Sequence, residues 1–135
     1  MAVNLNYPVA LRNTRLDGIT TRAGGSAKLR IYDGTQAADA DTAIGAQVLL
    51  VTLTCNATFA PAASGGVLTL NAITSGVAGA TGTASWFRIV DTAGTTTACD
   101  GTVGLSGTDL ILTTTAISSG ATVSCSSFTI TEANS

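Results

Sequence analysis

Residues 81–90 (TGTASWFRIV) constrain the fold most, because they hold the only tryptophan of the chain. In an extended backbone the even-numbered residues 84–90 lie on one face and the odd-numbered residues 85–89 on the other. Both faces are largely apolar, so this strand needs cover on each side. We therefore predict that residues 81–90 form a central strand of a β-sandwich, with Trp86 and Phe87 in the core.

Short segments with strand character recur along the rest of the chain, with a turn signal about every ten residues. They are Lys28–Tyr32 and residues 47–55, 67–73, 95–103, 109–115 and 121–131. Together they predict an all-β domain over residues 25–135, a sandwich or jelly roll of seven to eight short strands, or a barrel. Phe128 is expected in its core, residues 35–45 in a surface loop, and Asp100-Gly101 at a turn or bulge.

Residues 1–24 are predicted to form an N-terminal arm and the one helix of the chain. Apolar residues recur at helical spacing over Val9–Ala23, Pro8 suits the first turn, and Gly24-Gly25 ends the pattern. Gly18 weakens this helix by about 1 kcal/mol relative to Ala, so we expect it to curve or break there. Residues 1–7 precede Pro8 and form the arm.

Only 10% of the residues are charged, well below the roughly 25% of an ordinary domain. The surface must then consist of Thr, Ser, Asn and Gly, which favours contact with partners or other copies. Residues 1–32 carry five basic residues and one acidic residue, whereas residues 33–135 carry one basic residue and seven acidic residues. This polarity would guide contacts between copies, or reflect only the preference of helices for Arg and of turns for Asp.

No set of residues typical of an active site is evident. The chain has no histidine, and Cys55, Cys99 and Cys125 lack the spacing of a metal site. We therefore predict no enzyme, no catalytic residue, no metal and no cofactor, and three free buried cysteines. The acidic chain, with a pI near 4.6, argues against nucleic acid as a partner. Without a signal peptide or a membrane-spanning apolar run, we expect synthesis in a reducing cytoplasm and no membrane partner.

Several stretches resemble small virion proteins of tailed bacteriophages. They are LRNTRLDGIT at 11–20, LRIYDG at 29–34, ATFAPAASGGVL at 57–68, GTASWFR at 82–88 and SSFTIT at 126–131. The resemblance covers most of the chain, but its motifs are structural and carry over no functional residue. Proteins of this kind are similar to the cement, or decoration, proteins that clamp neighbouring major capsid subunits.

The resemblance implies a virion protein on the capsid surface, made in the host cytoplasm, whose partners are the major capsid protein and other copies of itself, as a dimer or a trimer. We expect the arm and the helix to reach the capsid or a sister copy. The predicted contact residues are Tyr7, Val9, Arg12, Arg15, Leu16, Ile19 and Arg22. The alternative is a recognition module, either a phage tail or fibre component or a carbohydrate-binding domain, in which Trp86 would be exposed as a stacking platform.

Overall fold

The computed structural model of the chain describes residues 5–125 and 127–132. Within them the chain forms one helix and eleven short strands, which confirms a β-rich fold with a single helix. The elements are α1 (Val9–Ala23), β1 (Lys28–Tyr32), β2 (Leu49–Thr54), β3 (Val67–Thr69), β4 (Gly76–Val77), β5 (Gly82–Thr83), β6 (Trp86–Val90), β7 (Thr97–Gly104), β8 (Leu110–Ile111), β9 (Ala116–Ile117), β10 (Thr122–Val123) and β11 (Thr129–Thr131).

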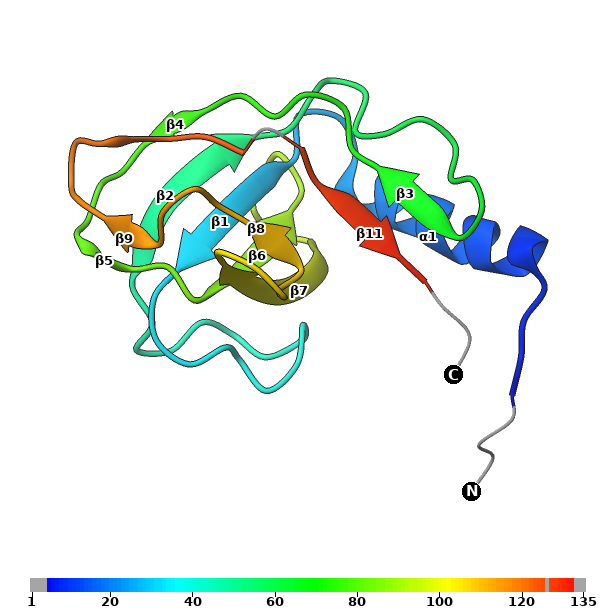
Figure 1. Cartoon of the computed structure of the whole chain (residues 1–135), viewed down its shortest axis with the longest axis horizontal. Coiled ribbons are helices and arrows are strands. Elements are labelled where there is room, and N and C mark those ends of the chain that lie inside the picture. Colours follow the sequence, from blue (N-terminus) through cyan, green and yellow to red (C-terminus); the bar gives the residue numbers. More distant parts are fainter. Residues whose placement is uncertain (1–4, 126, 133–135) are drawn as a thin grey trace.

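The largest sheet has five strands in the order β2-β1-β6-β7-β8. Its neighbouring strands are antiparallel except for the parallel pair β7 and β8. Figure 1 shows the strands curled into a half-barrel, with α1 to one side. β6 lies in the middle of the order and all five of its residues are buried, so its prediction as a central strand is confirmed.

The two faces of this sheet have different roles. The inner face contributes Leu29, Ile31, Phe87 and Ile89 to the main hydrophobic core. The outer face presents β6 residues Trp86, Arg88 and Val90, which are also buried. The predicted alternation holds over β6 but not at Ala84, which joins the main core. Ala84 lies before β6 begins, and its N–H donates to the carbonyl of Thr115 in a different segment.

Three two-stranded ribbons, β3–β11, β4–β10 and β5–β9, complete the fold. The strands predicted over residues 67–73, 109–115 and 121–131 are therefore shorter than expected, and more numerous. The chain changes partners within each segment. After β3, for example, the N–H of Leu70 donates to Phe128 whereas the N–H of Asn71 donates to Phe59.

The helix spans Val9–Ala23 as predicted. Pro8 precedes its first turn, and Gly24, at φ 71°, ends it with an N–H bond to the carbonyl of Thr20. Gly18 does not break it. Leu16 and Ala23 are buried, and α1 packs on β3 and β7, so helix and strands share one core.

Asp100-Gly101 was expected at a turn or bulge, and this prediction is wrong. Both residues lie inside β7, opposite Arg88 and Phe87 of β6, and the register shift falls instead near Val90. Gly101 is required by packing, because a Cβ atom there would lie 2.5 Å from Cε1 of Phe87. Asp100 is required because its carboxylate pairs with the buried guanidinium of Arg88.

We predict opposite effects for the same substitution at two glycines. Gly101→Ala should lower the free energy of unfolding by about 1–3 kcal/mol, since the ring of Phe87 is buried edge-on against Phe128. Gly18→Ala should raise it by about 0.5–1 kcal/mol, because a Cβ there meets no atom within 4 Å. Urea denaturation measures both, and a destabilising Gly18→Ala or a neutral Gly101→Ala would contradict this packing.

Candidate functional site

The outer face of the sheet contains a buried ion pair between Arg88 of β6 and Asp100 of β7. Arg88 is 5% exposed. Its Nε donates to Asp100 Oδ1 at 2.7 Å and its Nη2 to Oδ2 at 2.8 Å, a bidentate arrangement. The hydrogen bonds that Arg88 donates to Asp100 are the main reason that the pKa of Arg88 is raised. The pair thus satisfies two charges that would be costly to bury separately.

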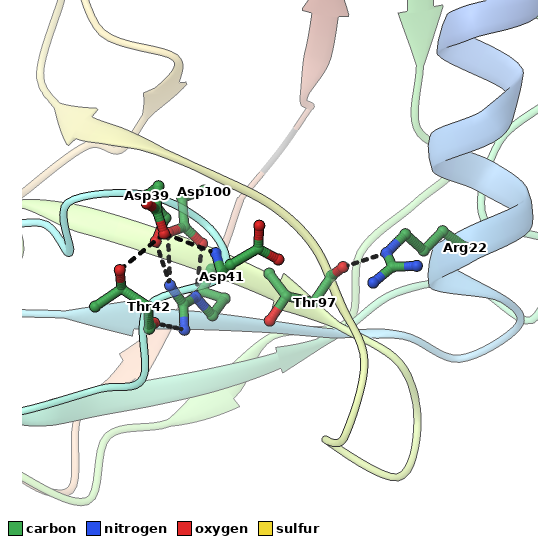
Figure 2. Close-up of polar contacts among 7 residues, drawn as sticks. Arg22, Asp39, Asp41, Thr42, Thr97 and Asp100 are labelled. Carbon is green, nitrogen blue, oxygen red and sulfur yellow. Dashed lines mark hydrogen bonds and ion pairs between the residues drawn. The ribbon is translucent and has the colours of Figure 1, made fainter.

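The same guanidinium holds a loop. Nη1 of Arg88 donates to the carbonyl of Thr42 at 2.8 Å, and Nη2 donates to the carbonyl of Asp39 at 3.2 Å. Figure 2 shows Asp39, Asp41 and Thr42 gathered beside Asp100. Arg88 therefore joins three parts of the chain: the central strand, its neighbour β7, and the loop between β1 and β2.

Aromatic packing anchors the start of this loop. The Trp86 ring stacks on Tyr32 with centroids 4.7 Å apart, and Arg88 lies over Trp86 at 5.6 Å. The indole Nε1 of Trp86 donates to the carbonyl of Asp33 at 3.1 Å. Trp86 is 1% exposed, so it presents no ring face on which a sugar could stack.

Polar side chains stabilise the loop from within. Asp39 Oδ1 accepts bonds from the Thr42 hydroxyl at 2.8 Å and from the Asp41 N–H at 3.1 Å, and the Thr42 bond is the main reason that the pKa of Asp39 is lowered. Gln47 donates to the carbonyl of Thr35, and Asp33 accepts from the N–H of Val48. The loop is fixed although residues 33–48 form no strand.

A groove of about 600 Å³ opens between the two limbs of the loop, lined largely by small side chains of residues 33–38, 42–43 and 45–48. Exposed apolar residues continue from it onto the sheet: Val48 is 44% exposed, Leu49 40% and Val77 67%. Leu49 and Val77 line one further hollow of about 240 Å³. We call residues 33–49 together with Val77 the loop face.

The loop face differs from the surface predicted from sequence. The strand predicted over residues 47–55 was expected to be buried on both sides at its start, and this is wrong for Val48 and Leu49. Burial on both faces begins at Leu50 and Val51. One feature of the sequence could have indicated the ordered loop. Arg88 is a lone cation on an apolar strand, so its burial requires hydrogen-bond partners from other segments.

The predicted contact residues of the helix are largely engaged within the chain. Leu16 is buried and Ile19 packs against the core. Arg15 forms an ion pair with Glu132 at 2.6 Å and lies over the Tyr7 ring at 5.0 Å. Arg12 donates to the carbonyl of Glu132.

Arg22 donates to the carbonyl of Thr97, as Figure 2 shows. Val9, at 45% exposed, is the predicted contact residue whose apolar side chain is most open to solvent, and Leu5 and Leu11 are comparably exposed. Residues 1–4 of the predicted arm lie outside the described residues.

The chemistry of the described residues offers no metal centre, since no group of three or more Cys, Asp or Glu side chains is placed to hold an ion. The three cysteines are unpaired. Burial raises the pKa of Cys55 to about 11 and is the main cause that raises the pKa of Cys99 to about 12 and that of Cys125. Thiols of this kind are poor nucleophiles at neutral pH. In the described part of the chain, no helix is long and apolar enough to cross a membrane.

Comparison with known proteins gave no relative: no family model, no curated protein and no solved structure matches the chain.

The bonds of Arg88 to Asp100 and to the carbonyls of Asp39 and Thr42, which we call the Arg88 clamp, are testable by a double substitution. Arg88→Met should lower the free energy of unfolding by about 3–5 kcal/mol, because Asp100 is left buried without its cation. Arg88→Met combined with Asp100→Leu should lower it much less. In both variants the amides of residues 36–46 should exchange faster, since the loop carbonyls lose their donors. Equal destabilisation by the single and double variants would contradict the clamp.

The cysteines give a prediction about reactivity. Raising the pKa of Cys55 from 9.0 to about 11 lowers its thiolate fraction at pH 8 roughly a hundredfold. All three thiols should react slowly with an aromatic disulfide reagent at pH 8 in the folded protein and quickly in urea. Fast modification of one thiol in the folded protein at pH 8 would show that its site is open.

Proposed function

We propose that the chain is a decoration protein of a tailed-bacteriophage head, which binds the major capsid protein at capsomer junctions and stabilises the shell by contact alone. The resemblance of residues 11–131 to small virion proteins motivates this function. The observation that carries it is the loop face, where Val48, Leu49 and Val77 are exposed together beside an open groove. Exposed apolar surface of this kind is typical of protein interaction sites.

The loop face is suited to binding because it is ordered in advance. Arg88 fixes the carbonyls of Asp39 and Thr42, and Trp86 fixes that of Asp33. A partner that docks there does not have to order a mobile loop, so less of the binding free energy is lost to conformational entropy. Apart from Asp33, Asp39 and Asp41 the loop face carries no charge, so the contact would depend mainly on apolar burial and hydrogen bonds.

The mechanism would be mass action. A protein that binds only the assembled lattice stabilises that lattice by its binding free energy, and many copies add their contributions. Copies on the head would be dimers or trimers on local symmetry axes, because few surface charges oppose association. The protein would lie on the capsid surface and be made in the host cytoplasm. Within this proposal, the half-barrel and its ribbons form the two layers of a sandwich or jelly roll.

We predict that Val77→Asp lowers occupancy of purified heads, because an unpaired carboxylate would be buried at the contact. A penalty of even about 1.4 kcal/mol weakens binding tenfold. Leu105→Asp is the matched control, since Leu105 is 60% exposed but follows β7, outside the loop face. Head occupancy is measured by co-sedimentation with heads that lack the protein, followed by gel quantification.

Unchanged occupancy for Val77→Asp would rule out the loop face as the capsid contact. A wild-type protein that does not bind heads at all, or that is present at a handful of copies per virion, would rule out the decoration function. That result would favour the alternative of a tail or fibre component.

A further inference from the structure

Among residues 5–125 and 127–132, β11 pairs with β3 along one edge, and no other strand pairs with its second edge. In the register of β11 with β3, Ile130 lies opposite Leu68. On one side of this pair the carbonyl of Phe128 accepts from the N–H of Leu70, and on the other the N–H of Glu132 donates to the carbonyl of Gly66. In an antiparallel pair the hydrogen-bonding residues alternate, so the N–H and C=O groups of Thr129 and Thr131 point away from β3. Among the described residues, no hydrogen bond to these four groups is found. Such an edge can accept another strand.

A groove of about 370 Å³ runs along this edge. One wall is residues 128–131, and the other consists of Cys99, Asp100, Thr108 and Asp109, with Phe87 between them. No β3 residue lines it, so the groove lies on the open side of β11. In Figure 1 β3 lies on one side of β11 and the β7–β8 region on the other. The groove thus combines unpaired backbone groups with a partly apolar floor.

The N-terminal segment has the pattern that this groove requires. In residues 1–6 (MAVNLN) the large apolar side chains of Met1, Val3 and Leu5 alternate with the small side chain of Ala2 and the polar side chains of Asn4 and Asn6. An added strand aligns its two faces with those of its neighbour. Its apolar side chains would then lie with Phe128 and Ile130 over the groove floor, and its polar side chains with the exposed Thr129 and Thr131.

We infer that residues 1–6 of one copy add as a strand to the open edge of β11 in a second copy. Addition of an extended segment to a sheet edge is a common mode of peptide recognition, in which the main chain supplies affinity and alternate side chains supply specificity. In Figure 1 the described part of the arm runs from the start of α1 away from the half-barrel. This contact rests on the proposed function, which places copies side by side, but it is separate from the loop face and can be tested without heads.

The test removes a single outward-facing N–H from β11. Thr131→Pro deletes the outward donor and leaves the β3 pairing intact, since that N–H does not face β3. Thr69→Pro is the matched control: Thr69 lies opposite Thr129 on β3, and its N–H faces away from β11 and from the groove. A third variant lacks residues 2–6. Sedimentation equilibrium of each full-length protein across concentration gives its association constant.

The inference predicts that the wild type and Thr69→Pro associate equally, and that Thr131→Pro and the deletion variant associate at least about tenfold more weakly. A mixture of these last two should recover a complex, because one supplies the arm and the other the open edge. Association of Thr131→Pro equal to that of Thr69→Pro would overturn the inference, as would a wild type that is monomeric throughout.

Head binding separates this contact from the proposed function. If Thr131→Pro loses self-association but the wild type does not bind heads, the arm contact stands and the decoration function fails. If the wild type binds heads but Thr131→Pro self-associates normally, the decoration function stands and the arm contact is overturned.

Discussion

The buried ion pair between Arg88 and Asp100 is the interaction on which the outer half of the structure depends. Two opposite charges on adjacent strands satisfy each other, and the remaining donors of Arg88 fix the carbonyls of Asp39 and Thr42. A loop without secondary structure of its own is thereby held against the outer face of the sheet, on which Tyr32 and Trp86 stack. Without Asp100, the buried guanidinium of Arg88 would keep the two loop carbonyls as partners, but its charge would have no counterion.

Much of the fold follows from local patterns in the sequence. The helix Val9–Ala23, the strand Lys28–Tyr32 and the central strand around Trp86 are predictable, because each has a clear period and a clear end signal. The two-stranded ribbons are not predictable in this way, because which strands pair in them depends on how the large sheet curls. Asp100-Gly101 shows the limit most clearly: its residue types are those of a turn, but Arg88 and Phe87 opposite them decide the outcome.

The candidate site was less predictable than the fold. Basic residues of the helix suggest a contact surface, but Arg12 and Arg15 bind Glu132, 120 and 117 residues away along the chain, and Arg22 binds Thr97. A further exposed apolar surface is formed by residues 33–49, of which residues 35–45 were predicted only to lie on the outside. The role that we propose for the arm likewise depends on the open edge of β11, which no local pattern reveals. The two proposals therefore use separate surfaces, the loop face for the capsid and the open edge of β11 for a second copy.

We propose that the ordered loop face docks on the capsid. Hydrogen–deuterium exchange of the protein, free and bound to purified heads, tests it most directly, because it reports which amides a partner covers. Amides of residues 36–49 and 77–79 should exchange slowly enough to follow in the free protein and more slowly still on heads. Unchanged exchange there, with protection elsewhere on the domain, would contradict the account.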